Sequence, residues 1–141
     1  MRRALALATA LSLLGSLTVT GAASAETWTK YIDGANGVQW SYDADYTYKD
    51  RETGRVVVMQ AISKPEAKIG PSGPGKSDGV GSVVALDCGK KNMITLGSYK
   101  PNQPLDIKST WRKDTPKKAD GPDNAALLTA VCAVAAQAPV K

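Results

Sequence analysis

The chain has 141 residues, with 18 Lys and Arg against 13 Asp and Glu, two cysteines and no histidine. This length fits one domain rather than two. The lack of histidine excludes Ser-His-Asp and Cys-His catalysis, imidazole metal sites and histidine pH switches.

The first 25 residues have the pattern of an export signal. A short basic start precedes the apolar run from Ala4 to Val19, and an Ala-x-Ala triplet ends at Ala25. This order is typical of a secretory signal peptide that is cleaved before Glu26. The run is shorter and more polar than a transmembrane anchor, and no cysteine lies near the cleavage site to carry a lipid. We therefore expect export by the general secretory route to a periplasmic or secreted location, with no lipid and no membrane anchor after cleavage.

The mature chain, residues 26–141, is expected to form one domain. Removing 25 residues from 141 leaves 116, and the loss of Arg2 and Arg3 lowers the formal net charge from +5 to +3. A nucleic-acid-binding domain usually carries a concentrated basic face. So small a positive charge in an exported protein predicts no nucleic-acid partner.

The two cysteines, Cys88 and Cys132, both lie in the mature chain. An even number of cysteines in an oxidising compartment indicates a disulfide. Two cysteines without histidine are too few for a four-ligand zinc site. A redox pair usually has Cys-x-x-Cys spacing, whereas these residues are 44 positions apart, so a structural bridge is the favoured interpretation.

Six short segments of the mature chain have the alternation and the β-branched or aromatic residues of strands. They are residues 27–32, 38–42, 46–49, 55–62, 82–88 and 92–99. Asn36-Gly37 supplies the positive φ that a tight turn needs between the first two segments. The run from Val56 to Met59 is apolar at every position, which predicts a central strand buried on both faces.

One helix is expected over residues 123–137, after a proline- and lysine-rich segment, residues 100–121. The apolar stripe of this helix consists of Leu127, Leu128, Val131 and Cys132, and its candidate caps are Asp120, Asp123 and Asn124. Alternation along a strand puts Cys88 on the same apolar face as Val84 and Leu86. The sequence therefore predicts an α+β fold, an antiparallel sheet of about six strands with one C-terminal helix tethered to one face by a disulfide.

Residues 70–77 match the phosphate-loop pattern G-x-x-x-x-G-K-[ST]. That chemistry needs a strand before the loop and a helix after it, whose N-terminal amides bind the phosphates. Here Asp78-Gly79-Val80-Gly81 and then a strand follow, and Pro71 and Pro74 lack backbone N–H donors. No nucleotide and no other cofactor is therefore expected, and the long loop of residues 64–81 is instead a candidate for contacting a partner.

Three further groups of residues were weighed as sites. Asp43 and Asp45 are interpreted as a strand-end turn rather than a calcium loop. The lysines of the late loop are interpreted as solvated side chains, namely Lys113, Lys117 and Lys118. The aromatic residues are interpreted mostly as core, with the alternative that four of them line an exposed binding face: Trp40, Tyr42, Tyr46 and Tyr48.

The order of these features resembles the surface-adhesin protein E family of small exported bacterial proteins. The residues that carry the resemblance are Trp28, Val38-Gln39-Trp40-Ser41-Tyr42-Asp43, Arg55-Val56-Val57-Val58-Met59, Val84-Ala85-Leu86-Asp87-Cys88, Tyr99, Trp111 and Leu127-Leu128-Thr129-Ala130-Val131-Cys132. The resemblance implies a curved antiparallel sheet with a disulfide-tethered C-terminal helix, binding of host matrix proteins, and dimerisation. The family's named member is anchored by a lipid, and this chain has no lipidation cysteine.

Three classes of function remain open from the sequence. The first is an exported, non-catalytic, adhesin-like protein that binds a protein or an extracellular polymer. The second is a periplasmic inhibitor or accessory subunit of an envelope complex. The third, an enzyme, is disfavoured because the chain offers no histidine, no metal cluster and no nucleophile–base pair.

Overall fold

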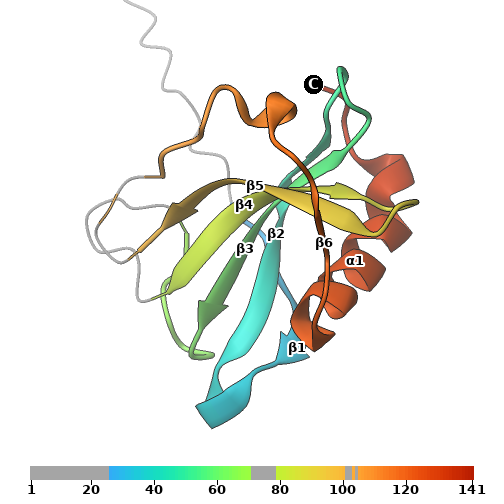
Figure 1. Ribbon diagram of the computed structural model, residues 1–141. Helices are drawn as coiled ribbons and strands as arrows, with labels where there is room; N and C mark the ends of the chain where they lie inside the picture. The colour runs from blue at the N-terminus through green and yellow to red at the C-terminus, as the bar shows by residue number, and fades with distance from the viewer. Residues whose placement is uncertain (1–25, 71–78, 101–102, 104) are drawn as a thin grey trace, which may run out of the picture.

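The computed structural model describes residues 26–70, 79–100, 103 and 105–141. They form one six-stranded antiparallel sheet in which each strand pairs with the next along the chain, and a helix lies against it (Figure 1). The strands are β1 (Trp28–Asp33), β2 (Gln39–Lys49), β3 (Val56–Ser63), β4 (Val80–Asp87), β5 (Asn92–Tyr99) and β6 (Lys117–Lys118). The helices are α1 (Pro122–Val134) and three 3₁₀ turns, η1 (Ala35–Gly37), η2 (Trp111–Lys113) and η3 (Ala135–Gln137). The α+β class is as predicted.

Two parts of the sequence analysis lie outside the described residues. They are the predicted signal peptide, residues 1–25, and most of the phosphate-loop match at residues 70–77. Both interpretations remain predictions.

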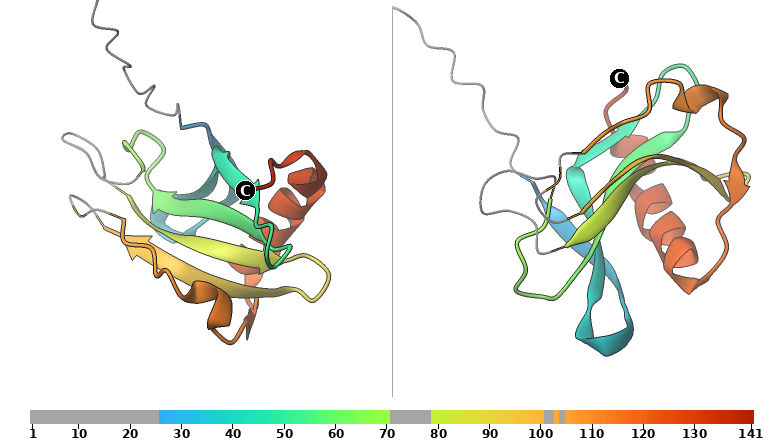
Figure 2. Two further views of the ribbon diagram at one scale, coloured as in Figure 1. Left: turned by 90° about the horizontal axis from the view of Figure 1, so that it is seen from above. Right: turned by 60° about the vertical axis from the view of Figure 1, so that its left-hand side comes forward.

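The central strand β3 is buried on both faces, as its apolar run predicted. Alternate side chains enter two separate cores, because successive residues of a strand point to opposite sides of the sheet. Val56 and Val58 pack on the side that carries α1, whereas Val57 and Met59 pack on the other side. Each face of the sheet therefore has its own core. The sheet is twisted, and α1 lies against one of its two faces (Figure 2).

On the side of the sheet that carries α1, the apolar stripe of this helix covers the core. Leu127, Leu128 and Val131 are buried, and they pack against residues of β2, β3 and β4: Tyr42, Val56, Val58, Val84 and Leu86. Burying a Leu or Val side chain contributes about 1.5–3 kcal/mol, so this contact is a principal source of helix stability in a segment too short to be helical alone.

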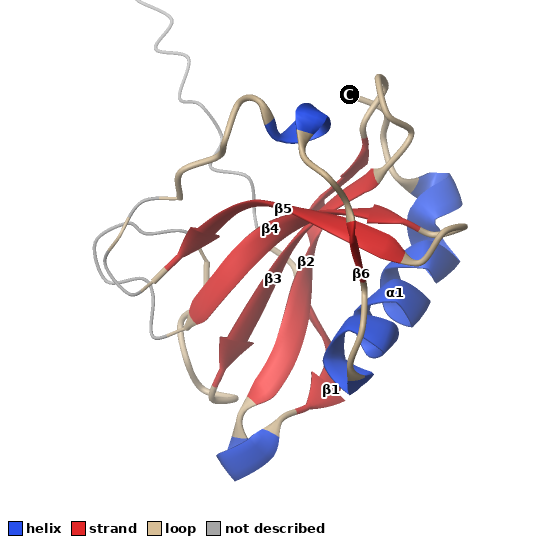
Figure 3. Cartoon of the chain, in the orientation of Figure 1, coloured by secondary structure: helices blue, strands red, loops and turns tan. Residues whose placement is uncertain are grey.

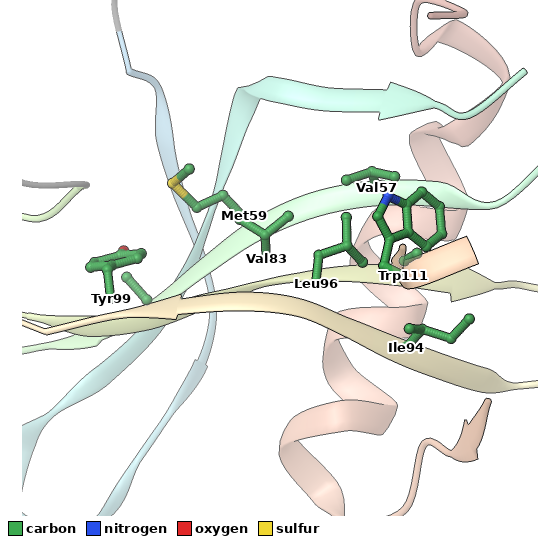
Figure 4. Close-up of a cluster of buried hydrophobic side chains, with 9 residues drawn as sticks. Val57, Met59, Val83, Ile94, Leu96, Tyr99 and Trp111 are labelled. Carbon is green, nitrogen blue, oxygen red and sulfur yellow. The ribbon is translucent and has the colours of Figure 1, made fainter. Parts of the chain in front are cut away.

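The opposite face is closed without an α-helix. Residues 105–113 cross it as a loop that ends in η2, and Trp111 lies beside Val57 and Leu96 in the core (Figure 4). Trp111 is only 3% exposed. The prediction that residue 111 lies in the late loop is confirmed, and its side chain is what that loop contributes to the core.

An ion pair between the buried carboxylate of Asp50 and the exposed side chain of Arg112 holds this loop in place. Arg112 donates from Nη2 to Asp50 Oδ1 at 2.5 Å and from Nε at 3.2 Å, while Thr53 donates its backbone N–H and its hydroxyl to Asp50 Oδ2. Asp50 lies in the turn between β2 and β3, 62 positions from its partner. The hydrogen bonds from Arg112, and secondarily those from Thr53, outweigh burial and lower the pKa of Asp50 to about 2.

The disulfide joins Cys88 to Cys132, as predicted, with the two Cα atoms 5.8 Å apart. It connects the end of β4 to the last turn of α1, at the end of the sheet where the turn between β4 and β5 lies (Figure 3). Cys88 follows the strand rather than lying within it, and its side chain is exposed instead of sharing the apolar face of Val84 and Leu86. The bridge therefore fixes the helix end from outside the core.

Several strand ends differ from the predicted ranges by one or two residues, and three larger differences remain. The second and third predicted strands are one strand, β2, with an irregularity between Asp43 and Tyr48, so the predicted strand-end turn is wrong. The predicted late loop contains β6, which pairs with Asn92 and Met93 of β5. The helix begins at Pro122 and ends in η3, and none of the candidate caps bonds its first turn through a side chain.

Removal of the disulfide should lower stability. Cys88→Ser or Cys132→Ser should reduce the free energy of unfolding by about 2–5 kcal/mol, because the bridge restricts the unfolded chain. Urea unfolding of oxidised wild type and of each variant measures the effect. A thiol assay that finds two free thiols in the exported protein would contradict the bridge.

The Asp50–Arg112 pair should make stability fall in acid. Because the pKa of Asp50 is lower in the folded chain, its contribution is complete above the unfolded value of about 3.9 and is lost as pH falls towards about 2. Asp50→Asn should therefore lower the free energy of unfolding by about 1.5–3 kcal/mol at pH 7, and the gap from wild type should close near pH 2.

Asp120→Asn is the matched control, because Asp120 is an exposed carboxylate whose lysine partner is also exposed. Its effect should be below about 0.5 kcal/mol at either pH. An Asp50→Asn gap that stays constant from pH 7 to pH 2 would contradict the assignment.

Candidate functional site

The helix covers only part of its face of the sheet. Along β3, Val56 and Val58 pack beneath α1, whereas the next two residues that point the same way are Gln60 and Ile62. These continue towards the end of the sheet that carries the turn between β1 and β2, away from the disulfide. A groove of about 330 Å³ opens there, and no residue of α1 lines it.

A row of polar side chains separates the covered part from the open part. The hydroxyl of Tyr31 donates to Gln60 Oε1 at 2.9 Å, and Gln60 Nε2 donates to the hydroxyl of Ser82 at 3.1 Å. The row crosses from β1 to β4 and holds Gln60 in one orientation, since both ends of its amide are bonded. Burial, and secondarily the charge of Asp123 in α1, raises the pKa of Tyr31, which keeps its hydroxyl neutral and able to donate.

Beyond this row the sheet presents apolar side chains again. Trp40, Ile62 and Val80 lie side by side on β2, β3 and β4, because they pair in register. Val80 is 41% exposed, one of the few large aliphatic side chains left so open among the described residues. The ring of Tyr31 lies against that of Trp40, with centroids 6.5 Å apart.

We call this surface the Trp40 groove. It is lined by Trp40, Gln60, Ala61, Ile62, Val80, Gly81, Ser82, Ser98, Tyr99 and Lys100. A second depression, of about 630 Å³, adjoins it and shares Ile62 and Val80; its other walls include Val38, Lys64 and Glu66. The first residues of the predicted contact loop, 64–81, therefore form part of the same surface.

The rim of the two depressions carries more positive than negative charge. Lys100 lies at the first depression, and Lys64 and Glu66 lie at the second. All three side chains belong to exposed residues. The surface thus has an apolar floor, a fixed polar row and a weakly basic rim.

The four aromatic residues weighed as one binding face do not share a face. Trp40 lines the groove and Tyr42 is buried under α1, while Tyr46 and Tyr48 pack against the opposite core. The irregularity of β2 is the reason, because Asp43 pairs with Met59 but Tyr48 pairs with Val57. The residues inserted between them reverse the alternation.

The charged candidates are also separated. Asp43 is 3% exposed and accepts hydrogen bonds from the backbone N–H groups of Thr27 and Asp45, so it stabilises the irregular part of β2. Lys117 and Lys118 lie on β6, and Lys113 ends η2. Within the described part of the chain, no group of three acidic or cysteine side chains is placed to hold a metal ion.

Sequence reasoning missed most of the groove. Tyr31, Gln60, Ile62, Val80 and Ser82 were not singled out. One signal was present, because Gln60 interrupts a strand that is otherwise apolar and buried, and a buried amide needs partners on neighbouring strands.

The fold and the groove together define a small disulfide-bonded α+β domain with an open apolar surface at one end of its sheet. No protein-family model, curated protein or solved structure matches the chain. Among the residues that the structure describes, no helix is long and apolar enough to cross a membrane. The disulfide indicates an oxidising compartment outside the cytoplasm.

Replacement of Trp111 and of Trp40 should have different effects on stability, because Trp111 lies in the core and Trp40 lies at the groove. Trp111→Ala should lower the free energy of unfolding by about 3–5 kcal/mol, because removal of the buried indole leaves a cavity in the core. Trp40→Ala should cost less than about half of that, because its ring is partly solvated at the groove. Urea unfolding followed by far-ultraviolet circular dichroism measures both, and equal losses would contradict the assignment of Trp40 to an open surface.

Proposed function

We propose that this chain is an exported, non-catalytic binding protein whose Trp40 groove takes an apolar side chain of a protein partner, flanked in that partner by acidic residues. The observation that carries the proposal is the apolar trio beyond the polar row, in which Val80 is exposed and Trp40 and Ile62 are half-buried. An apolar surface that the chain's own helix leaves open is a common form of interaction site.

The groove has the features of an interface anchor. Binding energy concentrates where an aromatic or aliphatic side chain enters a pocket and excludes water. Trp40 supplies the aromatic wall, and Gln60 is already fixed by Tyr31 and Ser82, so it loses little freedom when a partner binds. Ser98 and Ser82 supply polar groups at the edge of the apolar floor.

The charge of the rim favours an acidic partner segment. Lys64 and Lys100 are exposed, and Glu66 balances only one of them. Rim charges contribute mainly to the rate of association and to the choice of partner, because solvent screens them. We therefore expect binding to weaken as salt rises, with the apolar anchor accounting for the remaining affinity.

Export supports a partner in the cell envelope or beyond it. The N-terminal pattern predicts a secreted chain, and the disulfide fits that compartment. The resemblance to the surface-adhesin protein E family favours a matrix or cell-surface protein as the partner. If the partner that binds the groove is instead an envelope enzyme or a component of an envelope complex, the chain is an inhibitor or an accessory subunit.

The groove should be tested by capture with matched variants. The mature chain, bound to a support through a C-terminal affinity tag so that Lys64 and Lys100 stay free, is incubated with envelope and extracellular-matrix protein extracts, and captured proteins are identified by mass spectrometry. Val80→Glu and Trp40→Ala should each reduce capture of the specific partner at least tenfold, because they remove the apolar anchor site and, for Val80→Glu, repel acidic groups.

Val134→Glu is the control, because Val134 is 42% exposed on α1 and lines neither depression of the groove. It should leave capture unchanged. Capture that is lost equally in Val80→Glu and Val134→Glu, or retained in all three variants, would place the interaction elsewhere. If the wild-type chain retains no specific protein from these extracts, the proposed function is contradicted.

A further inference from the structure

Thr27, which directly precedes β1, is hydrogen-bonded to the buried carboxylate of Asp43 in β2. The backbone N–H of Thr27 donates to Asp43 Oδ1 at 3.1 Å, and the hydroxyl of Thr27 donates to Asp45 Oδ2 at 2.6 Å. The carbonyl of Thr27 accepts from the backbone N–H of Ala44 at 2.9 Å. These bonds fix the position of the preceding residue, Glu26, beside the irregular part of β2.

Asp43 lies in surroundings that are unfavourable for a negative charge. It is 3% exposed, and burial, with a smaller contribution from the Glu26 carboxylate, raises its pKa despite the backbone N–H groups that point at it. Glu26 and Asp43 also raise the pKa of Tyr99 on β5, after burial as the larger cause. Glu26, Asp43 and Tyr99 therefore bring two carboxylates and a phenol into electrostatic contact here.

The hydroxyl of Tyr99 is a second buried polar group that has room for a further hydrogen bond among the described residues. Tyr99 is 2% exposed, and its hydroxyl has no hydrogen-bond partner in the described part of the chain. Its ring lies against Gly81, where an added Cβ would collide with the ring and with the backbone carbonyl of Gln60. A buried hydroxyl without a partner is rare, and its position near Glu26 and Asp43 fits a site that receives a further donor.

We propose that cleavage between Ala25 and Glu26 completes this site, because the newly formed α-ammonium group of Glu26 pairs with the buried carboxylate of Asp43. The inference rests on the predicted cleavage position and does not require that a partner binds the Trp40 groove. Hydrolysis by a signal peptidase adds one water across the peptide bond and leaves a carboxylate on Ala25 and an ammonium on Glu26.

The geometry brings the new charge within reach. Neighbouring backbone nitrogens are at most about 3.6 Å apart, so the nitrogen of Glu26 lies less than about 7 Å from Asp43 Oδ1 before any adjustment. The titratable groups that interact with Asp43 or Thr27 are the carboxylates of Glu26 and Asp45 and the phenols of Tyr46 and Tyr99.

The phenols of Tyr46 and Tyr99 stay neutral at neutral pH, because burial raises the pKa of both. An ammonium beside the Asp43 carboxylate lowers the pKa of Asp43 and raises its own above the ordinary value of about 7.7–8.0. The uncleaved precursor has a neutral amide at the same position and lacks this interaction. Processing therefore makes the first strand more firmly attached in the exported form than in the precursor.

The test compares two chains that differ only at the N-terminus. One begins at Glu26, and the other retains Ala23-Ser24-Ala25 before it. At pH 6 the unfolding equilibrium constant of the first chain should be about tenfold smaller, which corresponds to a one-unit pKa rise of the α-amine. The stabilisation is complete below the unfolded pKa of the amine and is lost as pH rises through the folded value, so the difference should disappear above about pH 10.

Asp43→Asn should remove the difference, while Asp33→Asn, which alters an exposed carboxylate of β1, should preserve it. If Asp43→Asn does not fold, ¹³C-dimethylation of the α-amine of wild type and its NMR titration provide the answer. A raised amine pKa supports the pairing, and an ordinary value overturns it. Equal stability of the two chains, or an exported protein that does not begin at Glu26, would also overturn it.

Discussion

The attachment of α1 to one end of the sheet decides which surface of this protein is available. The bridge between Cys88 and Cys132 holds the last turn of the helix at the end of β4, and the buried stripe of Leu127, Leu128 and Val131 fills the sheet face beneath it. A helix of 13 residues spans about 20 Å, so it cannot also cover the far end of that face. The Trp40 groove is what remains open.

The opposite face shows how differently the same sheet can be closed. There Trp111 and its loop complete the core, and the Asp50–Arg112 pair fixes the loop to the turn between β2 and β3. Only the carboxylate of this pair is buried, so loss of Arg112 would leave a buried charge without its partner. The pair therefore positions the loop, while apolar burial supplies most of the stability.

The architecture could be predicted because each of its main signals is local. The apolar run of β3, the Asn36-Gly37 turn and the helical stripe near Cys132 depend on neighbouring residues, and the even cysteine count supplied the tether. The groove could not be predicted in the same way, because it depends on the register of three strands. The alternative of a face with four aromatic residues failed because β2 is irregular between Asp43 and Tyr48. That irregularity separates Trp40 from Tyr46 and Tyr48, which simple alternation would place together.

The central claim is that the open end of the helix-side face is where a partner binds, and its most direct test uses the three tryptophans of the chain. ¹⁵N NMR of the mature protein follows the indole N–H signals of Trp28, Trp40 and Trp111 while the captured partner is added. The account predicts that the Trp40 signal shifts in proportion to occupancy while the signal of buried Trp111 stays in place. Saturated binding with an unchanged Trp40 signal would contradict it.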